Sequence, residues 1–249
     1  MNRNKWLWTI VLILTGAVIW NYPVTYHIGI NGIAHEKKIP IYAKLCGFLY
    51  RDWMYKDIVF DATRDSKDKE IEKVLGILRW TTENIKGSIP PGLKAMDDHP
   101  LNIIIRQYAA REQIDDIFTI LCSYAGFRSG TKKCYTSDKT RHIILSFVKV
   151  SGRWLIFDAS RNRYFLNREN KIGSVEDYLR GDLILPDKEK EEYKEFLDDL
   201  KNIDFSSFTR PEEQMPIRRV MIEVERIFRP DKRPKDDIKE RCMAGRKIN

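Results

Sequence analysis

The sequence predicts an α+β fold in which a central helix packs on an antiparallel sheet. Residues 114–124 carry apolar side chains at helical spacing, and Gly126 is placed to cap that helix at its C-terminus. From residue 128 to residue 157 the pattern changes to that of short strands separated by turn residues. A helix followed directly by a β-hairpin is therefore the predicted core. An apolar helix precedes it and charged helices follow it.

Three strands are expected after the central helix. Residues 128–135 form the first strand, residues 136–139 a turn, and residues 141–150 a second strand that is rich in β-branched side chains. Ser151-Gly152 makes a tight turn into a third strand, residues 153–157. The second and third strands thus form a hairpin.

Shorter elements are expected before the central helix. Residues 35–51 are predicted as a short helix with one apolar face. Ser66 is predicted to cap a second helix that ends near Ile85. Pro100 then opens a short apolar stretch that ends at Tyr108.

The N-terminal segment, residues 1–24, is predicted to hold the protein at a membrane. Arg3 and Lys5 precede an uncharged apolar run from Trp6 to Trp20. Aromatic side chains at both ends of the run suit the two interfaces of a bilayer, although the run is shorter than the ~20 residues that cross its core. An uncleaved signal anchor is favoured over a cleaved signal peptide and over a buried soluble helix. Because Arg3 and Lys5 favour the cytoplasmic side, a single-pass protein with an extracytoplasmic main domain is expected.

The C-terminal part of the chain is strongly charged. Residues 189–203 and 213–228 are predicted amphipathic helices. Residues 229–249 hold eight basic and four acidic side chains, which gives 8 − 4 = +4 of the chain's formal net charge of +8. This basic tail is expected to be disordered, with contact to an anionic surface as the alternative. No nucleic-acid reading motif accompanies the charge, so nucleic acid is not favoured as a partner.

The cysteines are far apart in the sequence: Cys46, Cys122, Cys134 and Cys242. Because no CxxC pair occurs, neither a metal site nor a dithiol redox motif is expected. Glycine-rich phosphate loops are absent as well, so no nucleotide cofactor is expected. In an oxidising compartment the cysteines could form disulfides, but their spacing does not say which ones pair.

Four segments together resemble the transglutaminase-like branch of the papain-like thiol enzymes. These segments are Leu75-Gly-Ile-Leu-Arg-Trp80, residues 111–126, Arg141-His142-Ile-Ile-Leu-Ser and Gly152-Arg-Trp-Leu-Ile-Phe-Asp-Ala. The resemblance runs from residue 67 to residue 165 and implies a papain-like domain over residues 35–183. Residues 184–228 are then additional C-terminal helices.

The resemblance implies where a reactive site would lie. In that family a cysteine at the start of the central helix is the nucleophile, because a helix N-terminus lowers the pKa of a thiol. The resemblance assigns His142 as the base and Asp158 as the acid that orients it. It places Arg111 at the nucleophile position, and a guanidinium group cannot attack an acyl carbon. Arg111 is expected either to pair with an acid such as Asp158 or Glu112, or to bind an anion.

Two other cysteines, Cys122 and Cys134, lie close enough in the sequence to be candidates for the nucleophile. Cys122 falls in the middle of the central helix and is expected to be a core side chain. Cys134 lies on the strand that enters the hairpin, and could act with His142 and Asp158 if its sulfur reached the histidine ring. A structural thiol or a disulfide is the alternative for Cys134.

The expected function is therefore binding rather than turnover. The favoured interpretation is a catalytically inactive transglutaminase-like domain at the cell envelope that recognises a peptide or a polysaccharide. The first alternative is an active thiol peptidase or acyltransferase that uses Cys134. The second is a structural envelope protein, in which the anchor, the charged helices and the basic tail bind partners.

Overall fold

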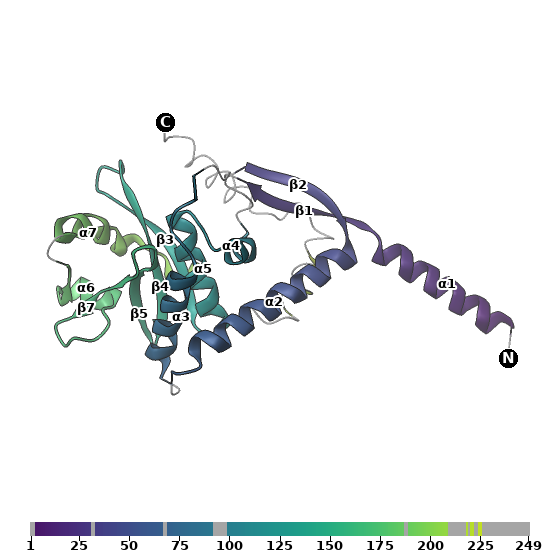
Figure 1. The fold of residues 1–249 in the computed structure, drawn as a ribbon, viewed down its shortest axis with the longest axis horizontal. Coiled ribbons are helices and arrows are strands. Elements are labelled where there is room, and N and C mark those ends of the chain that lie inside the picture. The colour runs from purple at the N-terminus through teal and green to yellow at the C-terminus, as the bar shows by residue number, and fades with distance from the viewer. Residues whose placement is uncertain are drawn as a thin grey trace. The chain divides into compact units, whose positions relative to one another are not determined.

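The computed structural model describes residues 3–30, 33–66, 69–91, 99–186 and 189–208, together with the helical residues 218, 220, 221, 224 and 225. The described residues confirm an α+β protein with antiparallel sheets (Figure 1). They fall into two compact units, the first containing residues 3–53 and the second residues 54–91 and 100–208. The predicted tail at 229–249 and most of the predicted helix at 213–228 lie outside the described residues.

The first unit contains an N-terminal helix and a β-hairpin. Helix α1 (Arg3–Trp20) is followed by strand β1 (Pro23–Ile30), which pairs antiparallel with strand β2 (Ile33–Pro40). Pro23 pairs with Pro40 at the open end of the hairpin. The N–H of Ile41 donates to the carbonyl of Tyr22 over 3.0 Å, so the two ends of the hairpin are tied together.

The predicted helix at residues 35–51 is wrong at both ends. Residues 35–40 belong to β2, and helix α2 (Ile41–Thr63) begins only after Pro40 and continues twelve residues beyond Arg51. The physical reason is Pro40, whose ring disfavours helical backbone at the residue before it, so the extended strand runs up to the proline. A proline is tolerated at such a boundary because it needs no N–H partner there.

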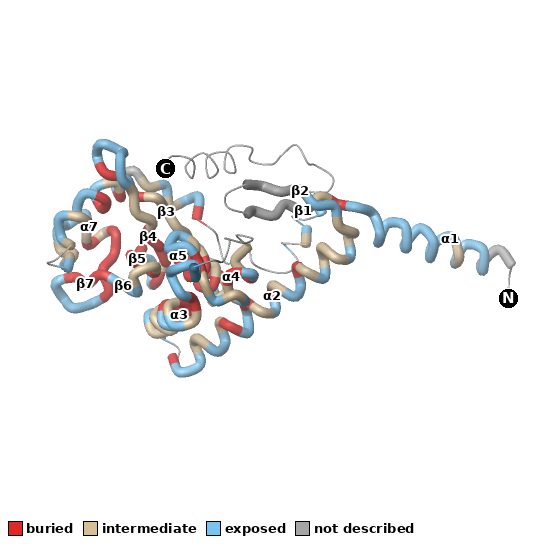
Figure 2. The backbone as a smooth tube through the Cα atoms, turned by 45° about the horizontal axis from the view of Figure 1, so that its top comes forward, coloured by how far each residue is buried: buried red, intermediate tan, exposed pale blue. Residues whose placement is uncertain are grey.

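From Trp6 to Trp20, every residue of helix α1 except the half-buried Ile10 is exposed (Figure 2). Trp6, Trp8, Leu12 and Val18 are each more than 60% exposed. Within the described residues, no helix combines the length and the apolar composition that crossing a membrane requires.

The second unit is built on a four-stranded antiparallel sheet with the order β3-β4-β5-β6. Its strands are β3 (Arg128–Tyr135), β4 (His142–Val150), β5 (Arg153–Asp158) and the short β6 (Arg163–Tyr164). These bounds confirm the three predicted strands. The tight turn at Ser151 and Gly152 is confirmed too, with left-handed φ values of 48° and 84°.

One face of this sheet packs on the central helix. Helix α5 (Arg111–Tyr124) begins and ends close to its predicted bounds, and Gly126 follows it with a φ of 94°. The core on this face joins side chains of α5, of helix α3 (Glu70–Asn84), of helix α4 (Pro100–Arg106) and of the sheet. Phe118 of α5 and Phe157 of β5 meet with ring centroids 5.2 Å apart. Burial of these apolar side chains holds helix and sheet together.

The predicted N-cap of α3 is wrong. The helix begins at Glu70, and Lys69 is its N-cap residue. The hydroxyl of Ser66 instead donates to the carbonyl of Thr63 over 2.5 Å, in the turn that ends α2. Glu70 and Glu72 place two acidic side chains in the first turn of α3, where the helix dipole favours them.

The opposite face of the sheet is covered by later parts of the chain. Helix α7 (Lys190–Leu197) buries Tyr193, Phe196 and Leu197 in a second core with Phe147 and Ile156 of the sheet. The predicted helix at 189–203 is thus shorter than expected, and residues 198–202 continue it as a 3₁₀ helix.

The segment that follows α7 covers edge strand β3. Arg128 donates from Nη2 to the carbonyls of Phe205 and Ser206, over 2.8 and 2.7 Å. Gly130 is required in β3, because a Cβ atom there would lie 2.9 Å from the ring of Phe208. These contacts protect part of an edge that could otherwise pair with another chain.

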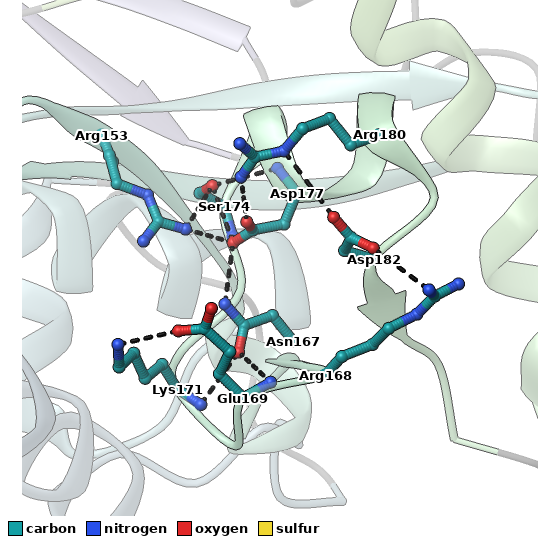
Figure 3. A network of polar contacts seen from close by, with 9 residues as sticks. All are labelled: Arg153, Asn167, Arg168, Glu169, Lys171, Ser174, Asp177, Arg180 and Asp182. Atoms are coloured by element: carbon teal, nitrogen blue, oxygen red, sulfur yellow. Dashed lines mark hydrogen bonds and ion pairs between the residues drawn. The ribbon is translucent and has the colours of Figure 1, made fainter.

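The remaining elements are helix α6 (Val175–Arg180) and the small sheet of β7 (Leu166–Asn167) and β8 (Leu183–Ile184). A polar network joins them to Arg153, at the start of β5 (Figure 3). Asp177 lies at its centre, receiving hydrogen bonds from Arg153, Ser174 and Arg180. Burial alone would raise the pKa of Asp177, but these donors lower it. The network is fully paired around Asp177, so its role is structural.

Candidate functional site

The start of helix α5 forms the first part of the candidate site. Arg111 is the first residue of the helix, and Ala110 before it supplies no side-chain cap. Gln113 takes over part of that role, since its Oε1 accepts from the Ala110 N–H over 3.0 Å. The first turn of α5 also carries two charged residues next to each other, Arg111 and Glu112.

Arg111 itself points to solvent. Its side chain is exposed, and it makes no hydrogen bond or ion pair with any residue that the structure describes. The expected pair between Arg111 and Asp158 or Glu112 is therefore not formed. A Cβ atom added to Gly87 would come within 4.0 Å of the Arg111 Cγ, so the stem of the side chain rests beside a glycine. The charged group is left free to meet a ligand.

His142 lies beside the same helix end. It is the first residue of β4, where it pairs with Tyr135 of β3. The two rings are 5.6 Å apart, and the His142 side chain is 30% exposed. Its Nε2 lies 3.6 Å from Oε1 of Glu112. The structure thus brings together the start of the central helix and the histidine at the start of the second strand.

The side chain of Asp158 does not lie beside the side chain of His142. Ser146 pairs with Phe157, and paired residues point to the same face of a sheet. His142 is four residues before Ser146 and shares its face, which is the face toward α5. Asp158 is one residue after Phe157, so its side chain points to the opposite face. The expected orientation of His142 by Asp158 is therefore wrong.

Asp158 is instead used to hold helix α7. The hydroxyl of Tyr193 donates to its Oδ2 over 2.6 Å, and the hydroxyl of Ser160 and the N–H of Arg161 donate to its Oδ1 over 2.8 and 3.2 Å. Burial, together with the hydrogen bond to Asp158, raises the pKa of Tyr193. Arg161 donates to the same hydroxyl over 3.1 Å. The carboxyl group is therefore engaged in a buried structural cluster.

The alternative nucleophile is also in the wrong place. Cys134 pairs with Ile143, so its side chain lies on the face opposite to His142, in the core with α7. It is fully buried, and burial together with the nearby Asp199 raises the pKa of its thiol to about 12. A thiolate is the reactive form of cysteine, so this thiol is inert at neutral pH.

The other two cysteines in the described residues are free as well. Cys122 is buried in the core as predicted, and burial raises the pKa of its thiol. Cys46 is a free, exposed thiol on α2. A disulfide between Cys122 and Cys134 is thus not formed. Cys242 lies outside the described residues.

One buried acid on the helix was not identified from the sequence. Asp115 stands one turn after Arg111 and is 1% exposed. Its Oδ1 accepts from the Ser146 hydroxyl over 2.7 Å and from the Ala159 N–H over 3.0 Å, whereas its Oδ2 has no hydrogen-bond partner. Burial raises the pKa of this carboxyl well above its usual range. Its position between Ile114 and Phe118, on the apolar side of the helix, was the available signal.

No group of acidic, histidine or cysteine side chains that could hold a metal ion occurs among the residues that the structure describes. Comparisons of the chain with models of known families, with curated proteins and with solved structures found no significant match in any of the three.

Proposed function

We propose that this chain is a transglutaminase-like module without catalytic activity, which is held at a membrane and binds an anionic peptide or polysaccharide beside Arg111. The observation that carries the proposal is the contact between the first turn of α5 and the first residue of β4. Arg111 occupies the first helical position, and His142 lies 3.6 Å from the neighbouring Glu112.

The side chains around His142 support the proposed lack of catalysis. A thiol enzyme needs a thiolate within hydrogen-bonding reach of a base. Arg111 offers no nucleophilic atom, because its guanidinium stays protonated. Cys134 and Asp158 both lie on the far face of the sheet from His142. Neither the nucleophile nor the orienting acid is therefore beside the histidine.

Binding of an anion is supported by the charge at this helix end. Arg111 is exposed and unpaired among the described residues, and it stands where the helix dipole already favours negative charge. A guanidinium group can hold a carboxylate through two parallel hydrogen bonds. A ligand carboxylate at Arg111 would offset the unfavourable position of a cation at a helix N-terminus.

Thiol reactivity tests the proposed lack of catalysis. The Cys242→Ser protein is incubated with iodoacetamide between pH 6 and pH 9, and modified peptides are mapped by mass spectrometry. Cys46, which is exposed, should react, while Cys122 and Cys134 should stay unmodified in the folded protein. Rapid modification of Cys134 at neutral pH would mean that this thiol is activated and that the proposal is wrong.

Binding is tested with two defined probes, poly-L-glutamate for the peptide class and alginate for the polysaccharide class. Arg111→Ala should weaken binding of one probe roughly tenfold, as expected for loss of a charged hydrogen-bonded pair. Arg79→Ala is the matched control, since Arg79 is an exposed arginine on α3. Equal effects of the two substitutions, or binding of neither probe, would contradict the proposed binding site.

A further inference from the structure

Helix α2 carries apolar side chains on two opposite faces. On one face Phe48, Tyr55 and Ile58 are buried, with at most 7% of each side chain exposed. On the other face lies an exposed set that we call the aromatic stripe. Its members are Tyr42 (38% exposed), Leu49 (55%), Tyr50 (50%) and Trp53 (59%). Their spacing of seven, eight and eleven residues from Tyr42 places them along one side of the helix, over about 16 Å.

The aromatic stripe begins beside the end of α1. The rings of Trp20 and Tyr42 are stacked, with centroids 6.4 Å apart and planes 13° from parallel. The hydrogen bond from the Ile41 N–H to the Tyr22 carbonyl fixes the same junction. Trp20 and Tyr22 are themselves 53% and 57% exposed. Exposed aromatic side chains thus continue from the end of α1 onto the side of α2.

We propose that the aromatic stripe of α2 lies on a lipid surface, at the boundary between headgroups and acyl chains. This inference rests on the membrane attachment in the proposed function and extends it to a second element. Tryptophan and tyrosine have an apolar body and a polar tip, and they are enriched at this boundary. Three of the four stripe residues are of these two types.

The neighbouring helix favours lipid over a protein partner. Most apolar side chains of α1 are exposed, since the part of the chain that the structure describes does not cover them, and Arg3 and Lys5 precede them in the sequence. The stacked pair of Trp20 and Tyr42 keeps the start of the stripe at the end of that helix. A lipid surface that contacts α1 can therefore also contact the aromatic stripe while the hairpin of β1 and β2 keeps its conformation. An amphipathic helix lying in the interface uses apolar and aromatic side chains in this way.

Cys46 provides a probe within the stripe. It is exposed, and it lies four residues after Tyr42 and four before Tyr50, which is one helical turn from each. Cys122 and Cys134 are buried, and Cys242→Ser removes the fourth thiol. The full-length Cys242→Ser chain is labelled at Cys46 with a small neutral fluorophore whose emission depends on solvent polarity. It is then mixed with vesicles of phosphatidylcholine and phosphatidylglycerol that carry a nitroxide-labelled lipid.

On binding to vesicles, the fluorophore emission should move to shorter wavelength and be quenched by the nitroxide. Leu49→Glu should abolish the quenching and lower vesicle partitioning roughly tenfold, because it places a charge on the surface that contacts lipid. Leu179→Glu is the matched control, since Leu179 is 53% exposed and lies on α6. That variant should behave as the parent protein.

Three results would overturn the inference, and they differ from one another. If the protein binds vesicles while the fluorophore stays in water, only the stripe contact is wrong and membrane attachment stands. If the protein does not bind vesicles, the attachment in the proposed function fails as well. If the emission shifts without vesicles and depends on protein concentration, the stripe binds a second copy of the chain.

Discussion

Asp115 offers a quantitative test of how α5 packs on the sheet. Its Oδ1 receives hydrogen bonds from Ser146 and Ala159, while its Oδ2 is buried without a partner. Burial raises the pKa of this carboxyl well above its usual range, so the folded protein holds the proton to a higher pH than the unfolded chain does. Asp115→Asn retains the accepting oxygen and removes the titration.

The sign of the pH effect follows from proton linkage. The stabilising contribution of a carboxyl with a raised pKa is fully present below the unfolded pKa, which is about 3.9 for aspartate. It is lost as the pH rises toward the folded pKa. In this window the wild type should lose about 1.4 kcal/mol of unfolding free energy per pH unit relative to Asp115→Asn. The buried amide of the variant adds a cost that does not depend on pH, so the slope is the informative quantity.

The assay is urea denaturation of both proteins between pH 4 and pH 7, followed by circular dichroism. The stability of Asp115→Asn relative to the wild type should increase with pH above the unfolded pKa, until the pH reaches the folded pKa. Asp57→Asn, at an exposed position on α2, corrects for the loss of one acidic group. A stability difference between wild type and Asp115→Asn that does not change with pH would refute the reasoning.

Two further substitutions, each with a matched control, test how helices pack in the second unit. Gly76→Ala should destabilise the protein by about 1–3 kcal/mol in a thermal melt, because an added Cβ would overlap with a backbone carbonyl of α2. Gly47→Ala on α2, which has room for a methyl group, should be neutral or stabilise by up to about 1 kcal/mol. Tyr193→Phe should cost about 1.5–3 kcal/mol of unfolding free energy, because it removes the hydroxyl that donates to Oδ2 of the buried Asp158. Tyr178→Phe, which removes an exposed hydroxyl contact, should cost less than about 1 kcal/mol. Equal costs for the two tyrosine substitutions would contradict the structural role of Asp158.

The central helix and the hairpin could be predicted from sequence because their signals are local and strong. The spacing of apolar side chains in residues 114–124 predicts helix α5. Gly126, which adopts a left-handed backbone conformation, predicts where the helix ends. The Ser151-Gly152 turn determines the register of β4 against β5. Elements with weaker local signals were placed less well. Residues 35–40 show little alternation of apolar and polar side chains and directly precede a helix. Their sequence alone therefore favours a helix over the strand that they form.

In the candidate site, the sequence did not predict which face of the sheet Asp158 occupies or which side chain it contacts. The resemblance to the thiol enzymes places Asp158 beside His142, but the two-residue turn sets a register that turns their side chains to opposite faces of the sheet. Counting from that turn would have revealed this in the sequence. The hydrogen bond from Tyr193 to Asp158 could not be foreseen, because it depends on where α7 packs, and Tyr193 lies 35 residues after Asp158 in the sequence. The approach of the first turn of α5, at Glu112, to His142 depends only on α5 and β4, and both elements were predicted.

In the proposed function, residue 111 occupies a nucleophile position from which the thiol has been lost. Arg111→Cys tests it most directly, in a background with Cys46→Ser and Cys242→Ser so that no other accessible thiol is present in the described residues. The pKa of the new thiol is read from the pH dependence of its alkylation rate, with Arg79→Cys in the middle of α3 as the control. We expect a thiol pKa below about 7.5 at position 111 and near 8.5 at position 79, and an increase of the pKa at position 111 when His142→Gln is added. A thiol at position 111 that titrates near 8.5 and does not respond to His142→Gln would contradict it.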